Sequence, residues 1–306
     1  MPLVTSQEML RAALEGHYAV GAFNANNMEQ VQGIVEAAME ERAPVILQAS
    51  QGAIRYAGLT CVTAIVRAVA EEADVPVVLH LDHGTDFDQN IRCLRAGFTS
   101  LMYDGSKRPY QENVEITSRV VRIAHVCGIP VEAELGQVLK STDNVTEEEV
   151  LAAMTDPEQA VDFVARTGCD SLAVAVGSVH AMESAQAELN IERLRAIHEA
   201  ISIPLVLHGS SGVKEESEVE AIRYGIAKIN VATMLNQAFT RGMKKALAAM
   251  PDNTDPRKVL VVSREEVKEV VRHKIRLFGS SGKVTASGYA SPPTQHRGVD
   301  IGGLEE

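Results

Sequence analysis

The residues in this chain best suited to chemistry are histidines and carboxylates that directly follow short apolar runs. His83, His180 and His208 each end such a run, whereas the other histidines are scattered along the chain. Three imidazoles that meet and leave a fourth position open form the usual arrangement of a catalytic zinc or related divalent site. The pattern predicts a metal centre with these three ligands, against the alternative that each is an ordinary buried or loop histidine.

Carboxylates accompany these histidines. Asp82 directly precedes His83, and a carboxylate beside a metal-held oxygen can move a proton to or from a hydroxyl group. Its alternative role is to accept a hydrogen bond from a metal ligand. Asp104 and Glu134 end two further apolar runs. They could orient the ligands or offer a second position to the cation, and the sequence does not choose between these roles. His80, two residues before Asp82, is expected to pack one layer lower.

Small and amide side chains form a second group near the end of the chain. Gly209-Ser210-Ser211-Gly212 follows one apolar run, and Asn230 and Thr233 lie at the end of the next. Loops after the last two strands of a (β/α)₈ barrel often bind phosphate through backbone N–H groups and hydroxyls. The group therefore predicts a phosphate site, although Gly-Ser-Ser-Gly alone could be an ordinary turn.

Eight β-branched or apolar runs position these residues, and helical patterns separate them. Because the runs lack strict polar alternation, they are typical of parallel strands covered on both faces. Eight strand–helix units predict a single-domain α/β protein, a (β/α)₈ TIM barrel. A doubly wound open sheet is the alternative, but no G-x-G-x-x-G follows the first run. The expected strands are Tyr18–Ala25, Pro44–Ser50, Pro76–Asp82, Thr99–Asp104, Pro130–Gly136, Ser171–His180, Pro204–Gly209 and Ala227–Thr233.

The barrel is expected to occupy residues 1–284, and residues 285–306 form a polar C-terminal tail. The polar stretch 137–149, in the longest interval between strands, is expected to be a mobile loop above the barrel mouth. Of the 306 residues, 45% are hydrophobic and 4% aromatic, and the net charge is −12. This composition excludes general disorder and argues against a nucleic-acid-binding protein. No long uncharged apolar run predicts a membrane span.

The first residues carry neither a basic region nor an apolar segment of a secretory signal. The four cysteines have spacings that match neither a zinc knuckle nor a dense disulfide scaffold, so they are expected to be reduced thiols. Both features predict a cytoplasmic protein.

Five motifs together resemble the class II, metal-dependent ketose-bisphosphate aldolases, which include fructose-1,6-bisphosphate and tagatose-1,6-bisphosphate aldolases. The resemblance runs in order from about residue 2 to about residue 283. The motifs are His-Leu-Asp-His-Gly (80–84), Glu-Ala-Glu-Leu-Gly (132–136), Val-Gly-Ser-Val-His (176–180), Leu-His-Gly-Ser-Ser-Gly (207–212) and Lys-Ile-Asn-Val-Ala-Thr (228–233).

The resemblance implies a zinc-dependent lyase of glycolysis that cleaves fructose 1,6-bisphosphate to dihydroxyacetone phosphate and glyceraldehyde 3-phosphate. His83, His180 and His208 would bind Zn²⁺, Asp82 would move the proton of the C4 hydroxyl, and Glu134 and Asp104 would lie beside the metal. A homodimer or homotetramer is also implied. The substrate-binding residues would be Gly209, Ser211, Asn230, Thr233, Gln48, Ser50 and Asn24.

Departures from the family pattern keep alternatives open. Ala181 stands where the family usually has glycine, and residues 139–144 replace its acidic mobile loop, for which Asp143 is the candidate substitute. Some motifs are closer to the tagatose branch, so tagatose 1,6-bisphosphate is the alternative substrate. Two alternatives with a different function are a non-catalytic barrel that binds sugar phosphates and a zinc hydrolase.

Overall fold

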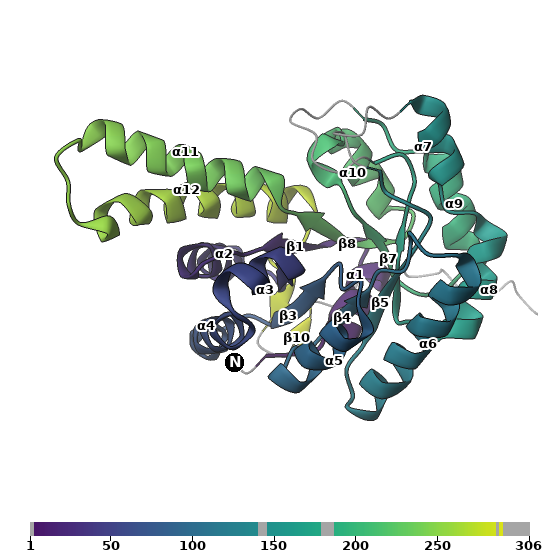
Figure 1. Cartoon of the computed structure of the whole chain (residues 1–306). Helices are drawn as coiled ribbons and strands as arrows, with labels where there is room; N and C mark the ends of the chain where they lie inside the picture. The colour runs from purple at the N-terminus through teal and green to yellow at the C-terminus, as the bar shows by residue number, and fades with distance from the viewer. Residues whose placement is uncertain (1–2, 140–145, 179–186, 286–287, 290–306) are drawn as a thin grey trace, which may run out of the picture.

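The computed structural model describes residues 3–139, 146–178, 187–285 and 288–289, which form eight parallel strands alternating with helices (Figure 1). This confirms the single-domain α/β barrel. The strands are β1 (Val20–Asn24), β2 (Val45–Ser50), β3 (Val77–Asp82), β4 (Leu101–Tyr103), β5 (Val131–Leu135), β6 (Ser171–Val174), β7 (Leu205–Leu207) and β8 (Ile226–Val231).

The sheet closes almost completely on itself. Its order is β3-β2-β1-β8-β7-β6-β5-β4, and β1 pairs in parallel with both β2 and β8. The edges β3 and β4 meet through the parallel bridges His80–Ser100 and Gly84–Tyr103. An open doubly wound sheet is therefore excluded, because its edge strands would not meet.

Most strands are a few residues shorter than the sequence predicts. The largest difference is in β6, which ends at Val174 and not at His180. Beyond it the carbonyl of Ala175 accepts a hydrogen bond from the amide of Thr155, and that of Val176 accepts one from Asn190. These backbone groups are thus used by neighbouring loops, which ends the sheet pairing.

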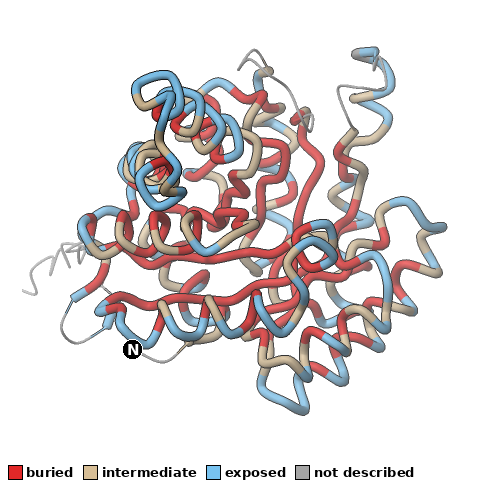
Figure 2. The backbone as a smooth tube through the Cα atoms, turned by 60° about the vertical axis from the view of Figure 1, so that its left-hand side comes forward, coloured by how far each residue is buried: buried red, intermediate tan, exposed pale blue. Residues whose placement is uncertain are grey.

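Most helices cover the outer face of the barrel, and burial along them is banded (Figure 2). Helix α1 instead packs against inward-facing strand residues such as Val20 and Ile46. Their boundaries often carry side-chain caps; the Asp86 carboxylate, for example, accepts from the amide of Gln89. The helices are α1 (Ser6–Glu15), α2 (Met28–Glu40), α3 (Gln51–Ala57), α4 (Leu59–Glu72), α5 (Phe87–Ala96), α6 (Tyr110–Val126), α7 (Glu147–Ala153), α8 (Pro157–Thr167), α9 (Ile191–Ala200), α10 (Glu215–Ile222), α11 (Thr233–Ala249) and α12 (Pro256–Leu277).

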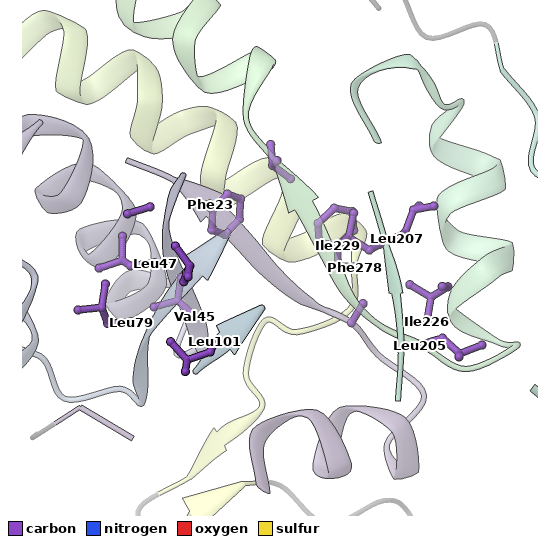
Figure 3. Packing of buried hydrophobic residues seen from close by; sticks show 14 of the residues in the cluster. Phe23, Val45, Leu47, Leu79, Leu101, Leu205, Leu207, Ile226, Ile229 and Phe278 are labelled. Carbon is purple, nitrogen blue, oxygen red and sulfur yellow. The ribbon is translucent and has the colours of Figure 1, made fainter. Parts of the chain in front are cut away.

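The main core lies between the strands and these helices. Figure 3 shows part of it: Phe23 and Leu47, from β1 and β2, belong to the same buried cluster as Ile229 of β8 and Phe278 after α12. All four side chains are at most 1% exposed. The apolar runs of the sequence thus supply the outward faces of the strands, and burial of this surface drives the fold.

The helices α11 and α12 form a pair that projects from the barrel (Figure 1). A Cβ atom at Gly242 of α11 would lie 2.6 Å from the Cα atom of Ser263 of α12, so only glycine permits this approach. After α12, β9 (Val284–Thr285) pairs with β10 (Gly288–Tyr289) in an antiparallel ladder. The rest of the expected tail, residues 286–287 and 290–306, lies outside the described residues.

No single helix in the described part of the chain has the length and apolar character to cross a membrane. Only α3 and α4 taken together pass that test, and they are bent by 96° relative to each other.

Glu41, directly after α2, anchors the end of α12. Its buried carboxylate accepts hydrogen bonds from Arg276 (2.6 Å), Arg272 (3.2 Å) and the Ser281 hydroxyl (2.8 Å). The Arg276 hydrogen bond is the largest influence on its pKa, which is lowered to about 2 against the opposing effect of burial. Because the pKa is lower in the folded protein, the stabilisation is present above about pH 4.5 and is lost as the pH falls toward 2.

We therefore expect Glu41→Gln to lower the free energy of unfolding by about 1–3 kcal/mol at pH 7 and by much less near pH 3. Denaturant unfolding at the two pH values measures this difference. Glu40→Gln is the matched control, because Glu40 is half-exposed and its ion pairs with Lys268 and Arg272 should contribute below about 1 kcal/mol. An equal, pH-independent loss in both variants would contradict the assignment.

Candidate functional site

The polar residues expected at the strand ends do gather at one mouth of the barrel. Asp82 ends β3 and His83 follows it, Asp104 follows β4, and Glu134 lies in β5. His208 directly follows β7. Because the strands are parallel, their carboxyl ends meet at the same end of the barrel.

Three of these residues form a group that could hold a metal ion. One ligand atom from each of His83, Glu134 and His208 lies within 4.8 Å of the others. The Nδ1 atom of His208 is 3.1 Å from the Glu134 Oε2 atom, and both side chains are buried. Two imidazole nitrogens and a carboxylate oxygen suit zinc and related divalent cations. The donor set therefore fits a metal. His180, the third predicted ligand, lies outside the described residues, as does Asp143.

The His83 ring is held in a defined orientation. Its backbone has a φ angle of 49°, which is unusual for a residue other than glycine. Its Nδ1 atom is 2.8 Å from the Asp104 carboxylate. Burial alone would lower the pKa of His83, but Asp82 and Asp104 outweigh burial and raise it to about 10. The surrounding carboxylates thus favour a positive charge, which a metal cation also supplies.

His208 is held from behind by a buried chain of charged groups. Its Nε2 atom lies 2.9 Å from Glu132 Oε1, and the other oxygen of Glu132 accepts a 2.7 Å hydrogen bond from the Lys228 ammonium group. All three side chains are at most 2% exposed. The chain of contacts directs the Nδ1 side of His208 toward Glu134 and His83. Partners of this kind fix the tautomer and orientation of a ligating histidine.

The sequence prediction did not include Glu132 or Lys228 in the site. The available signal was their spacing: Glu132 lies two residues before Glu134, and Lys228 two before Asn230, so each shares a strand face with a predicted site residue. His80 completes this lower layer. It is 1% exposed, its Nδ1 atom is 2.8 Å from the Ser100 hydroxyl, and its Nε2 atom is 3.3 Å from the Lys228 ammonium.

Asp82 is fixed by two amides. Its Oδ2 atom accepts a 2.7 Å hydrogen bond from Asn24, and its Oδ1 atom a 3.2 Å bond from Asn230. Burial would raise the pKa of Asp82, yet the His83 and His208 rings and the Asn24 hydrogen bond hold it below its ordinary value. Asp82 is therefore a carboxylate at neutral pH, and its Oδ1 atom lies 3.9 Å from the His83 Nε2 atom.

The predicted substrate residues occupy three places around this carboxylate. Asn24 and Asn230 contact Asp82 itself. Gln48 lies behind Asn24, to which its amide donates a 2.6 Å hydrogen bond, and it is 1% exposed. Ser50 ends β2, where its hydroxyl accepts from the amide of Ala53 and caps α3.

A hollow beside Asp82 joins the ends of β7 and β8. Gly209 takes a φ angle of 69° there, and the following residues Ser210–Gly212 form a 3₁₀ turn. Thr233, also at the hollow, is the first residue of the 17-residue helix α11. Backbone N–H groups at a helix start, glycine and small hydroxyls favour an anion. The hollow is lined by Asn24, Asp82, His83, Gly209, Ser210, Ser211, Asn230, Ala232 and Thr233.

Comparisons with known proteins agree with this geometry. The family model described as fructose-bisphosphate aldolase class-II matches residues 4–283. A probable fructose-bisphosphate aldolase of Bacillus subtilis is 46% identical over 286 residues, which cover 92% of this chain and 100% of that protein. The fructose-bisphosphate aldolase of Geobacillus stearothermophilus is also 46% identical, with 92% and 99% covered. The crystal structure of the YdjI aldolase from Escherichia coli K12 superposes with a TM-score of 0.81 at 37% identity, covering 92% of this chain and 100% of that one.

Proposed function

The chain belongs to the class-II fructose-bisphosphate aldolase family, and we propose that it reversibly cleaves fructose 1,6-bisphosphate to dihydroxyacetone phosphate and glyceraldehyde 3-phosphate. The observation that carries this proposal is the placement of Asp82. It is a buried carboxylate, oriented by Asn24 and Asn230, beside a donor set that fits a divalent cation. A retro-aldol reaction needs a base at the C4 hydroxyl and an electron-withdrawing group at the C2 carbonyl, two carbons away in the same substrate.

Asp82 takes the proton of the C4 hydroxyl. The C4 oxygen then forms the aldehyde carbonyl, the bond between C3 and C4 breaks, and its electron pair remains on the C3 side, conjugated with the C2 carbonyl. Addition of a proton at C3 then gives dihydroxyacetone phosphate. Each carboxylate oxygen of Asp82 accepts one amide hydrogen bond, from Asn24 or from Asn230, and these two bonds hold the base in one orientation. The positioning of the base lowers the entropy that must be lost in the transition state.

We assign the cation, most simply Zn²⁺, to His83, His208 and Glu134, with His180 as a further ligand. When bound, it withdraws electrons from the ketose half and so stabilises the negative charge that develops there. Asp104 holds His83, while Glu132 with Lys228 holds His208. The phosphate of the dihydroxyacetone half is assigned to Gly209, Ser211 and the start of α11 at Thr233, where neutral N–H and hydroxyl donors line the hollow. Because these donors are local and neutral, binding of the phosphate does not require the whole protein to carry a net positive charge.

We further propose a cytoplasmic homo-oligomer, a dimer or a tetramer. Support for the compartment comes from the four cysteines, all of which are free thiols, as is typical of proteins in a reducing environment. Support for the assembly comes from the family resemblance. Residues 1–284 would form the barrel domain, with the polar tail after it, and Asp143 would supply the acid of the loop above the mouth.

The proposed activity is tested by cleavage of fructose 1,6-bisphosphate and tagatose 1,6-bisphosphate in parallel, with the two triose phosphates measured as products. We expect kcat/KM to be higher for the fructose substrate. A preference for tagatose 1,6-bisphosphate would overturn the substrate assignment. Calorimetric binding of either sugar without any cleavage would replace the enzyme by a sugar-phosphate-binding barrel.

A further inference from the structure

Beneath the barrel mouth, the interior contains a continuous line of buried polar side chains, where branched aliphatic residues usually fill a (β/α)₈ barrel. Each member lies 2.7 to 3.3 Å from the next, and none is more than 5% exposed. In order, this interior polar line consists of Ser6, Ser100, His80, Lys228, Glu132 and His208. It therefore connects the candidate metal ligand His208 to Ser6, the first residue of α1.

Helix α1 closes the end of the barrel opposite the mouth. The amide of Val4, just before the helix, donates to the carbonyl of Val77, the first residue of β3. This bond places the segment at the amino ends of the strands. Leu10 of α1 belongs to the same buried cluster as Ile46 of β2. Packing of α1 against the interior therefore holds Ser6 in a fixed place at this end of the barrel.

Ser100 lies at the seam where β3 and β4 close the barrel. Its amide donates to the carbonyl of Leu79, and its carbonyl accepts from the amide of Leu81, so its backbone is bonded to β3 on both sides. Its hydroxyl lies 2.9 Å from the Ser6 hydroxyl and 2.8 Å from the His80 Nδ1 atom. Ser100 thus connects the helix at the closed end to the histidine above it.

The chemistry of Lys228 sets the direction of the hydrogen bonds in the line. An ammonium group only donates, so the His80 Nε2 atom, 3.3 Å away, accepts. Glu132 lies 3.7 Å from this nitrogen, beyond hydrogen-bond distance. Burial and the charge of Lys228 lower the pKa of His80 to about 3, so the ring is neutral and its proton is on Nδ1. Nδ1 donates to Ser100, whose own proton is left for Ser6.

Lys228 also donates in the other direction, toward the metal site. Its ammonium group bonds to one oxygen of Glu132, and the other oxygen lies 2.9 Å from the His208 Nε2 atom. Because a carboxylate only accepts, Nε2 donates and Nδ1 is the atom directed toward the candidate metal site. If His80 were not held, the buried ammonium would lose a fixed acceptor and could shift together with Glu132. The orientation of His208 therefore depends on groups well below it.

We propose that the hydroxyls of Ser6 and Ser100 are positioning groups for the metal centre. They hold the His80 ring in one tautomer and one orientation. Through the buried ion pair beside it, this ring fixes His208 near the opposite end of the barrel. Helix α1 is thus part of the support of the metal site as well as the closure of the barrel. The inference rests on the proposed function for the assignment of His208 as a metal ligand.

The affinity of the full chain for Zn²⁺, measured by competition with a chromophoric chelator, tests this role. Ser6→Ala and Ser100→Ala should each raise the Kd about three- to tenfold, less than the loss expected for groups that touch a ligand. Ser6→Thr and Ser100→Thr keep the hydroxyl and should stay within about twofold of the wild type. Ser280→Ala is the matched control, because this buried serine donates to the Ile275 carbonyl at the end of α12, outside the barrel.

A double-mutant cycle shows whether Ser100 acts through Lys228. In the Lys228→Met background, Ser100→Ala should weaken zinc binding no further, because the connection is already broken. Losses that add fully would overturn the inference. The ¹⁵N spectrum of the zinc-free protein tests the tautomer directly: His80 should carry its proton on Nδ1, and Ser100→Ala but not Ser280→Ala should shift that resonance. A proton on Nε2 would contradict the direction assigned to the line.

These measurements separate the inference from the proposed activity. If the protein cleaves no ketose bisphosphate but Ser6→Ala and Ser100→Ala weaken zinc binding and the threonine variants do not, the inference holds and the activity fails. If cleavage is observed while the Kd is unchanged in both alanine variants, the inference is overturned and the activity stands. Equal losses in Ser100→Ala and in Ser100→Thr or Ser280→Ala also overturn it. An effect of Ser100→Ala that Ser6→Ala does not share overturns the role of α1, and a wild-type chain that binds no zinc overturns the inference together with the metal assignment.

Discussion

Replacement of Asp82 by Asn is expected to reduce kcat for ketose-bisphosphate cleavage about a thousandfold, within the range that a positioned acid–base group contributes. The amide has nearly the same shape as the carboxylate but cannot take the proton of the C4 hydroxyl. Because Asp82 is ionised at neutral pH and held by Asn24 and Asn230, the wild-type side chain is ready to act as the base.

Single-turnover measurements with saturating substrate isolate the step concerned. Metal content and the melting temperature should remain close to those of the wild type, since the metal donors His83, Glu134 and His208 are unchanged. Asp162→Asn is the matched control, because this carboxylate lies on α8 and bonds to Tyr110 and Arg166 at the surface. If Asp82→Asn retained kcat within about threefold of the wild type, another group would have to remove the C4 proton.

Removal of the metal should have the second large effect. A chelator such as EDTA should decrease cleavage at least a hundredfold, and Zn²⁺ should restore it, because the electron-withdrawing group of the reaction is then absent. Metal binding is also expected to raise the melting temperature, since three side chains, two of them buried, would gain a common partner. Full activity after complete chelation would disprove the metal-dependent mechanism.

The buried chain behind His208 allows a sharper test of the same site. Glu132→Gln and Lys228→Met should each weaken Zn²⁺ binding about 10–100-fold, although neither residue is a proposed ligand. Competition with a chromophoric chelator measures the Kd of the metal directly, without reference to activity. Both variants should weaken zinc binding because Glu132 orients the proposed ligand His208, and the Lys228 ammonium group holds Glu132 through a 2.7 Å hydrogen bond.

Lys274→Met provides the matched control for Lys228→Met. Lys274 is likewise buried, and its ammonium group donates a 2.8 Å hydrogen bond to Glu218, but this pair joins α12 to α10 on the outside of the barrel. Its removal should lower stability by about 3–5 kcal/mol without altering the Kd for zinc. If Lys228→Met bound zinc as tightly as the wild type, the buried contacts from Lys228 through Glu132 to His208 would contribute to stability alone.

Much of the architecture could be predicted because it depends on local patterns. All eight strands lie within or overlap the runs that the sequence indicates, for which apolar and β-branched residues are sufficient evidence. Strand ends were less accurate. The predicted extension of β6 to His180 failed because the carbonyls of Ala175 and Val176 bond to loops distant in sequence.

The placement of site residues followed partly from the same patterns. Once the strands are parallel, residues at their carboxyl ends must meet, so His83, His208, Asp104 and Glu134 are brought together as expected. The hydrogen bonds among these side chains did not follow from the strand pattern. Asn24, which is predicted to contact substrate, donates to Asp82 and accepts from Gln48 in the structure.

By itself, the sequence determined the strand–helix alternation, the barrel class and the residue types that stand at the barrel mouth. Only the tertiary structure decided how those residues are paired. Asp82 and Asn230 are 148 residues apart in sequence, and Glu132 and Lys228 are 96 apart, yet each pair is hydrogen-bonded in the interior. A buried charge is tolerated only when it is paired, so the sequence implies that Glu132 and Lys228 have partners. Which partners they have depends on the closure of the barrel, because closure alone sets which strand faces which across the interior.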